Sequence, residues 1–148
     1  MKSFIGSKII LAMAMTRGEF VAYRYPNQTP NPDAGAPGDD GYLVEYTDGG
    51  KPNHPDHAGY ISWSPKEQFE GAYLPIGDVS KLAPHQVRVV AECEQLADRI
   101  KKLEAFLATP IYAGLPERER QLLKMQADAM VVYLGIINTR VEDFGSAA

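Results

Sequence analysis

Six basic side chains gather between residues 99 and 124, where the sequence predicts the end of one helix and the start of the next. Three acidic residues in the same stretch leave it with a net charge of +3, although the whole chain carries −4. Arg118 and Arg120 fall in the first turn of the second predicted helix, where the helix dipole is positive and acidic residues are favoured. Guanidinium groups at a helix N-terminus suit a phosphate. The candidate anion-binding residues here are Arg118, Arg120, Lys124, Lys102 and Arg99.

This cluster also has an ordinary explanation. A basic residue near a helix C-terminus, such as Lys102, complements the dipole, and alternating charges on a helix face are usually solvated. Glu117 and Glu119 would then balance the arginines. If the pocket lies elsewhere, the alternative positions are His85 and Arg88 at the start of the first long helix, or the aromatic first half of the chain.

The first half is rich in large aromatic residues. Most of them should pack a small core, but one or two at a subunit boundary could stack on a nucleobase, as aromatic side chains do in nucleotide sites. These residues are Tyr23, Tyr25, Tyr42, Tyr46, Tyr60, Trp63 and Tyr73.

Catalytic and metal-binding signals are weak. His54, Asp56 and His57 (KPNHPDHAG) have a spacing that matches no zinc signature, so a polar hairpin loop is the simpler interpretation. Cys93 is interpreted as a core residue rather than a nucleophile, because free cysteine is among the most buried residue types. No GxSxG, Walker A or GxGxxG motif occurs. We therefore predict binding rather than catalysis, with no metal and no cofactor.

Composition narrows the class of protein further. The 148 residues are 45% hydrophobic and 23% charged, which is ordinary for one folded domain or two small units. The negative net charge argues against binding of polymeric nucleic acid. The single cysteine favours a reducing compartment. No segment approaches the ~20 apolar residues that span a bilayer, so we expect no membrane association.

The N-terminal segment predicts a strand that leads into a helix. Phe4–Met13 is apolar and compatible with a strand, and Thr16 with Glu19 forms a capping box that starts a helix running to about Arg24. Met15 and Phe20 are placed to form the hydrophobic staple across that cap. A signal peptide fits less well, because the apolar run Ile9–Met15 is only at the lower limit of a signal core.

Two further strands and a short helix follow an irregular loop. Gly41–Thr47 alternates as a strand does, with Leu43 and Glu45 on one face, and Gly59–Trp63 is its predicted hairpin partner. Ser64 is the predicted N-cap of the next helix, with Pro65 at its first position, and that helix should end near Tyr73.

The second half predicts two long helices. Apolar residues from Val89 to Leu107 recur at spacings of 3 and 4, which is a heptad seam. TPIYAGL interrupts it, and Pro116 at the first helical position opens the second helix.

The second of these helices carries two apolar seams. One comprises Leu122, Met125, Ala129, Val132 and Ile136. The other comprises Leu123, Ala127, Met130, Leu134, Ile137, Val141 and Phe144. One seam should pack against the first long helix. The other must pack against the sheet unit or another subunit, and we interpret this width as a sign of a homo-oligomer.

The predicted fold class is therefore α+β. Residues 1–76 form a small antiparallel sheet unit with short helices, and residues 84–144 form an antiparallel two-helix hairpin packed with it. Such a three-stranded sheet is marginal alone and needs a covering layer.

Several segments resemble a known family. PHQVRVVAECEQLADRIKKLEAFLATPIYAGLPERERQLLKMQADAM is similar to the helical hairpin shared by two phage anti-defence sponges, the anti-CBASS cyclic-nucleotide sponge and the Thoeris anti-defence sponge. MTRGEFVAYR, GYLVEYTDGG and GYISWSPKEQFEGAY resemble the N-terminal sheet domain of the longer Thoeris sponge. The loop around Pro26–Asp40 is outside the resemblance.

This resemblance implies a non-catalytic protein of the infected host cell's cytoplasm. Members of the family assemble as dimers or hexamers and sequester glycocyclic ADP-ribose isomers, cyclic dinucleotides or cyclic trinucleotides, so that the defence effector stays off. Two alternatives remain open: a phage enzyme that degrades such signals with His54, Asp56 and His57 as a metal site, and a structural hairpin that binds only protein partners.

Overall fold

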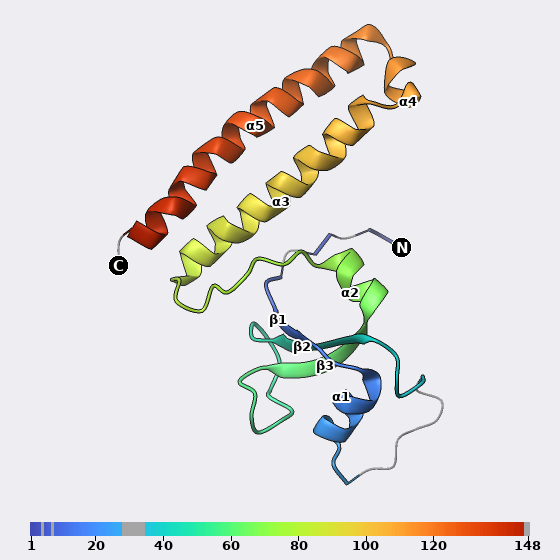
Figure 1. Ribbon diagram of the computed structural model, residues 1–148, viewed down its shortest axis with the longest axis vertical. Helices are drawn as coiled ribbons and strands as arrows, with labels where there is room; N and C mark the ends of the chain where they lie inside the picture. The colour runs from blue at the N-terminus through green and yellow to red at the C-terminus, as the bar shows by residue number, and fades with distance from the viewer. Residues whose placement is uncertain (4, 7, 28–34, 147–148) are drawn as a thin grey trace. The chain divides into compact units, whose positions relative to one another are not determined.

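Three short strands in the first half of the chain pair into one antiparallel sheet (Figure 1). The computed structural model describes residues 1–3, 5–6, 8–27 and 35–146. Its strands are β1 (Leu11–Ala14), β2 (Gly41–Tyr46) and β3 (Tyr60–Pro65), with β2 in the centre. The register places Leu43 of β2 between Met13 of β1 and Trp63 of β3. These are the strands that the sequence predicts, with changed ends.

The first strand is shorter than predicted. The sequence pattern indicates Phe4–Met13, whereas β1 begins at Leu11, which pairs with Glu45. The central strand β2 ends at Tyr46, one residue beyond Glu45. Residues that precede Leu11 therefore have almost no backbone of β2 with which to pair. Phe4 lies outside the described residues.

The helix α1 (Arg17–Arg24) begins as the sequence predicts. The hydroxyl of Thr16 accepts the Glu19 N–H at 3.3 Å, and the Glu19 carboxylate accepts the Thr16 N–H at 2.8 Å. This confirms the capping box. The helix buries Phe20 against Leu43 and Ile61, and Met15 packs on the same cluster.

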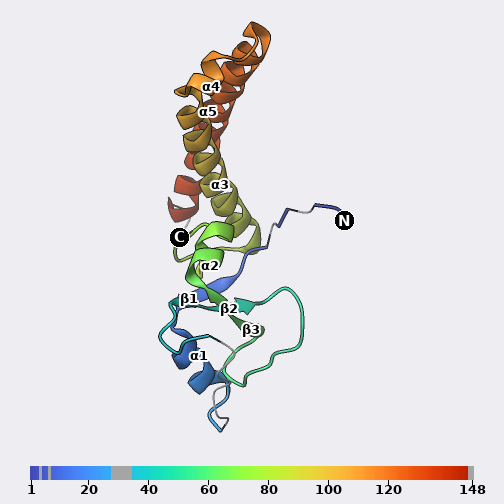
Figure 2. The same cartoon turned by 90° about the vertical axis from the view of Figure 1, so that its right-hand side faces the viewer.

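The short helix α2 (Lys66–Ala72) starts differently from the prediction. Ser64 was expected to cap it, but β3 extends through Pro65, and Ser64 pairs with Tyr42 in the sheet. The first helical N–H, that of Lys66, donates instead to the carbonyl of Asp40 at 3.1 Å. The ring of Phe69 stacks on Tyr42 with centroids 4.1 Å apart. Figures 1 and 2 show α1 and α2 on opposite sides of the sheet.

The chain divides into two compact units, Met1–Tyr73 (the sheet unit) and Leu74–Ala148. The second unit contains α3 (Pro84–Leu107), the single-turn α4 (Pro110–Ala113) and α5 (Glu117–Ser146). The helices α3 and α5 lie side by side as an antiparallel hairpin (Figures 1 and 2). An α+β fold with a C-terminal helical hairpin is thus confirmed.

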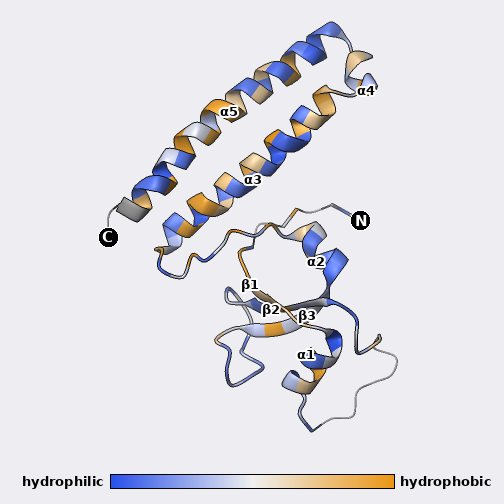
Figure 3. Cartoon of the chain, in the orientation of Figure 1, coloured by the Kyte–Doolittle hydropathy of each residue, from blue (hydrophilic) through white to orange (hydrophobic). Residues whose placement is uncertain are grey.

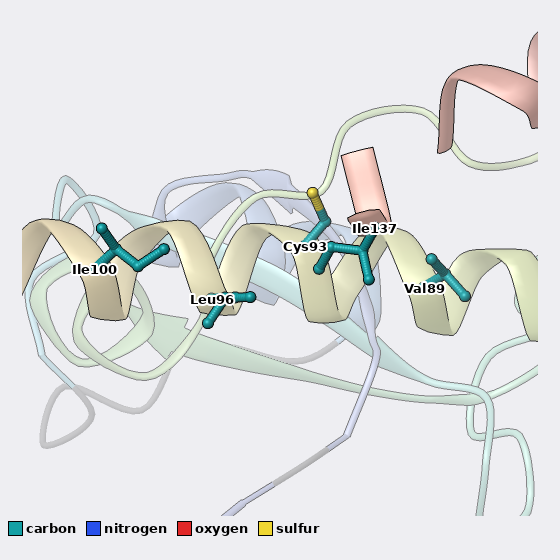
Figure 4. Packing of buried hydrophobic residues seen from close by; sticks show 5 residues of the cluster. All are labelled: Val89, Cys93, Leu96, Ile100 and Ile137. Carbon is teal, nitrogen blue, oxygen red and sulfur yellow. The ribbon is translucent and has the colours of Figure 1, made fainter. Parts of the chain in front are cut away.

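The core of the hairpin follows the predicted heptad seam of α3. Its buried members are Val89, Cys93, Leu96 and Ile100. Ile137 of α5 packs among them with 0% of its surface exposed, and Figure 4 shows it beside Cys93. Full burial of these branched side chains is the main source of stability in such a hairpin.

The two apolar seams of α5 have opposite environments. The inner seam packs on α3 through Met130, Leu134, Ile137, Val141 and Phe144. The outer seam is Leu122, Met125, Ala129, Val132 and Ile136, and all five of these side chains are exposed. Apolar segments therefore recur along the length of α5 (Figure 3), but only the inner ones contribute to the core of the hairpin. Among the residues described, no helix is long and apolar enough to cross a membrane.

Candidate functional site

The turn between α3 and α5 is held by side-chain hydrogen bonds. The hydroxyl of Thr109 donates to the Phe106 carbonyl at 2.7 Å and accepts the Tyr112 N–H at 3.2 Å. The buried Tyr112 in turn donates its hydroxyl to the Arg120 carbonyl at 3.3 Å. These contacts tie the short α4 to the first turn of α5. The backbone that carries Arg118 and Arg120 is therefore fixed before any ligand binds.

Arg118 and Arg120 have different surroundings in that first turn. The helix begins at Glu117, one residue later than predicted, and the Pro116 carbonyl accepts the Arg120 N–H. Arg118 is exposed, whereas Arg120 is half-buried and its guanidinium forms an ion pair with Glu117. Within the described residues, Nε of Arg120 is buried without a hydrogen-bond partner. The ion pair thus uses only part of the guanidinium, and Arg118 is open to solvent.

Lys102 and Lys124 lie at similar levels along the hairpin. The hydroxyl of Tyr133 donates to the carboxylate of Glu92, and the thiol of Cys93 donates to Asn138 Oδ1 at 2.8 Å. These two contacts set the helix register, which places Lys102 of α3 within about one turn of the level of Lys124 on α5.

The basic side chains of α3 at this end are Arg99, Lys101 and Lys102, and all three are exposed. Lys102 Nζ contacts Asp98 at 2.7 Å in an exposed i, i+4 pair, which is a weak interaction in water. The structure therefore brings five of the seven candidate residues toward the same end of the hairpin. We call them the basic end: Arg99, Lys102, Arg118, Arg120 and Lys124.

His85 and Arg88 lie elsewhere. Both are exposed in the first turns of α3, and fourteen residues separate Arg88 from Lys102. At ~1.5 Å per residue this is about 21 Å along the helix axis. A single small ligand does not reach both groups, so the seven residues form two separate candidate positions.

A hydrogen-bonded chain that the sequence analysis missed crosses the sheet unit. The buried carboxylate of Glu45 accepts the Gly59 N–H at 2.7 Å, and its other oxygen lies 2.7 Å from His57 Nδ1. His57 Nε2 lies 3.0 Å from the hydroxyl of Tyr23. A neutral imidazole that donates from Nδ1 and accepts the Tyr23 proton at Nε2 satisfies all these groups. The His57 hydrogen bond lowers the pKa of Glu45 from its ordinary value of 4.5.

The neighbouring histidine does not complete a metal site. His54 stacks on Tyr23 with centroids 4.4 Å apart, and its Nδ1 lies 3.8 Å from the exposed carboxylate of Asp56. In the part of the chain that the structure describes, no three His, Cys, Asp or Glu side chains are grouped to hold a metal ion. Both nitrogens of His57 already have partners. The arrangement fixes the loop between β2 and β3.

Cys93 has the properties of a packing residue. It is buried in the α3 seam. Burial, with a smaller effect of the Glu94 charge, raises the pKa of its thiol. A thiol nucleophile requires the opposite shift and an accessible sulfur, so the core interpretation of Cys93 is confirmed.

The second unit is a helical hairpin with basic side chains gathered toward the end that carries the turn. A family model described as Sequestin matches residues 83–143, the stretch that runs from the start of α3 almost to the end of α5. This part of the chain is similar to that family, whose name denotes sequestration, a binding role. Neither the curated proteins nor the solved structures contain a match to the chain.

Proposed function

We propose that this protein is a non-catalytic sponge for cyclic nucleotide immune messengers. It would bind glycocyclic ADP-ribose or cyclic di- and trinucleotides in the cytoplasm of an infected host cell and so keep the anti-phage effector inactive. The observation that carries the proposal is the Sequestin match, because it falls on the hairpin that bears the basic end. The resemblance of the sequence to phage anti-defence sponges supplies the ligand class.

The basic end is the proposed binding position. All ligands of this class carry phosphate groups, and arginine binds phosphate through paired charge-assisted hydrogen bonds. Arg118 is exposed at the positive end of the α5 dipole, next to the partly satisfied Arg120. Arg120 would exchange its ion pair with Glu117 for one with the ligand phosphate.

The outer seam of α5 supports a homo-oligomer, either a dimer or a hexamer. Its members follow the 3-4 spacing of a coiled-coil seam, which an identical helix of a second copy can match. Val132 and Ile136 expose 65% and 56% of their surface. Apolar side chains of this size in one continuous stripe indicate an association surface.

Isothermal titration calorimetry with alanine variants tests the site. A thermal-shift panel of cyclic dinucleotides, cyclic trinucleotides and glycocyclic ADP-ribose first selects the tightest ligand. We expect the substitutions Arg118→Ala, Arg120→Ala and Lys124→Ala each to weaken it by roughly ten- to a hundred-fold, the cost of one lost charge-assisted contact.

Arg140→Ala is the matched control, because Arg140 is an exposed arginine on the same helix but near its other end. Its affinity should equal that of the wild type. If Arg140→Ala weakens binding and the other three variants do not, the pocket lies at the opposite end, with Arg88 and His85.

Recovery of the ligand separates a sponge from an enzyme. After incubation with excess protein and heat denaturation, a sponge returns the cyclic nucleotide intact. A linear or hydrolysed product would replace the proposal with a degrading enzyme. If no cyclic nucleotide binds, the remaining hypothesis is a structural hairpin that binds only protein partners.

A further inference from the structure

One edge of the sheet, the strand β1, has backbone groups that face solvent, and we call it the open edge. It pairs with β2 on one side only, and all four of its residues are exposed. The Met15 N–H donates to the Gly41 carbonyl at 2.9 Å, so the backbone of Met15 faces β2. Because successive residues of a strand direct their N–H and C=O groups to alternate sides, those of Ala12 and Ala14 point away from β2. Within the described residues, no other strand lies beside them.

The opposite edge of the same sheet is protected. There the backbone groups of Ile61 in β3 point outward, and the side chain of Asn53 pairs with both of them. The Asn53 amide nitrogen donates to the Ile61 carbonyl at 2.9 Å, and Oδ1 accepts the Ile61 N–H at 2.8 Å. The strand β3 also ends at Pro65, and natural edge strands use proline to prevent further pairing. The sheet is therefore closed to a further strand at Ile61 and accessible to one at β1.

The open edge lacks the features that normally prevent a sheet from adding a strand. Natural sheets use charged side chains, prolines and bulges for this purpose, whereas Ile9–Met15 (IILAMAM) contains no charged residue, proline or glycine. The strand β1 is hydrophobic along its length (Figure 3). Leu11 and Met13 lie on the sheet face that carries Leu43, and they remain 56% and 55% exposed. A further strand beside β1 would bury these two side chains and satisfy the outward backbone groups together.

The residues that precede β1 continue in its direction. Lys8 Nζ contacts Asp48 Oδ1 at 3.0 Å. Leu11 is opposite Glu45 in the sheet, and Lys8 and Asp48 each lie three residues beyond that pair. The ion pair therefore follows the register of β1 with β2. It aligns the two residues between Lys8 and Leu11 with the open edge.

We propose that the open edge pairs with the open edge of a second copy, antiparallel, with a two-fold axis at Ala12. Ala12 is the midpoint of the uncharged segment Ile9–Met15, so this register pairs the whole segment with itself. The backbone groups of Ala12 bond to those of Ala12 in the second copy, and Leu11 lies beside Met13 of the second copy on the same face. The two three-stranded sheets become one continuous sheet.

A second copy is the occupant that the segment itself specifies. A two-fold pair satisfies the same backbone groups in both chains, and no like charges meet in it. This interface goes beyond the proposed function, because the oligomer proposed there uses the outer seam of α5. The open edge belongs to the sheet unit.

Disulfide cross-linking through Ala12→Cys tests the register. In the two-fold pair the Cα atoms of residue 12 lie about 5.5 Å apart, a separation that a disulfide spans. The native Cys93 is buried, so the wild type should not cross-link. Ala72→Cys is the control, because Ala72 is exposed on α2 of the same unit. After mild oxidation and non-reducing electrophoresis, Ala12→Cys should form covalent dimers roughly ten-fold faster than Ala72→Cys, since pairing raises the local thiol concentration. Equal rates overturn the proposal.

Opposite charges at residue 12 test whether the partner is a second copy. The variants Ala12→Lys and Ala12→Glu each place two like charges directly opposite in the pair, which weakens it. Both also carry Val132→Glu, which charges the outer seam of α5 and removes association through that surface. By sedimentation equilibrium, a mixture of the two should associate roughly ten-fold more tightly than either variant alone. Equal association in the mixture and in the separate variants would reject the two-fold pairing.

The variant Val132→Glu with Ala12 unchanged separates this interface from the oligomer proposed for α5. Dimers that persist in Val132→Glu and are lost when Ala12→Lys is added support the open edge. A mass near 16.3 kDa for Val132→Glu even at millimolar concentration would reject the open edge and leave the outer seam as the association surface. Fluorescence of Trp63, the one tryptophan of the chain, shows in each variant that the sheet unit is folded.

Discussion

Ile136 and Ile137 are neighbours on α5 with opposite environments, and replacing each with alanine separates the two faces of that helix. Ile137 is 0% exposed in the core of the hairpin, whereas Ile136 is 56% exposed on the outer seam. Both substitutions gain the same helix propensity, which is less than about 0.7 kcal/mol in favour of alanine. The difference between the two variants therefore reports burial alone.

The expected magnitudes follow from these exposures. Ile137→Ala removes a fully packed side chain and leaves a cavity, so the free energy of unfolding should fall by about 2–5 kcal/mol. Ile136→Ala in a free chain should change it by less than about 1 kcal/mol, because the propensity gain offsets the partial burial. If a second copy covers the outer seam, the loss for Ile136→Ala should grow with protein concentration, since association stabilises the folded state by mass action.

Urea unfolding followed by far-ultraviolet circular dichroism at several concentrations measures both effects. Light scattering on the same samples gives the mass. A mass near 16.3 kDa at micromolar concentration would contradict the oligomer. A loss below about 1 kcal/mol for Ile137→Ala would refute the assignment of the core. Equal losses for both variants at every concentration would mean that the outer seam is covered within one chain.

Two further predictions concern the sheet unit, whose unfolding Trp63 fluorescence reports. The pKa of Glu45 is lowered in the folded state, so its stabilising effect is complete above about pH 4.5 and is lost as the pH falls through the lower folded value. The sheet unit should therefore lose stability below pH 4.5, and a Glu45→Gln variant that shows the same slope there would contradict this. Thr16→Ala removes the side-chain cap of α1 and should lower the urea stability of the unit by about 1 kcal/mol, and an unchanged midpoint would show that the cap contributes nothing.

The elements that were predicted correctly are those whose sequence signal lies in residues close together in the chain. The capping box of Thr16 and Glu19 depends on a spacing of three, and the seam from Val89 to Ile100 depends on the helical period. Both are confirmed because no distant residue competes with them. The inner seam of α5 was found in the same way.

The predictions from sequence fail where a residue far away in the chain determines the local structure. Ser64 has the sequence features of an N-cap, but pairing with Tyr42 draws it into β3. The Glu45–His57–Tyr23 chain joins three elements across the sheet unit, and no spacing in the sequence shows it. One signal was present: Glu45 shares the predicted core face of its strand with Leu43, and a carboxylate at such a position requires a hydrogen-bonding partner.

Two features of α5 are unfavourable for the stability of an isolated folded helix. Arg118 and Arg120 oppose the dipole of its first turn, and the pairing of Arg120 with Glu117 is an exposed contact worth little. The outer seam leaves large apolar side chains in water. Violations of local rules concentrate where a protein binds something. A bound anion at the first turn would offset the unfavourable interaction of the two arginines with the helix dipole. A second copy packed on the outer seam would remove its apolar side chains from water.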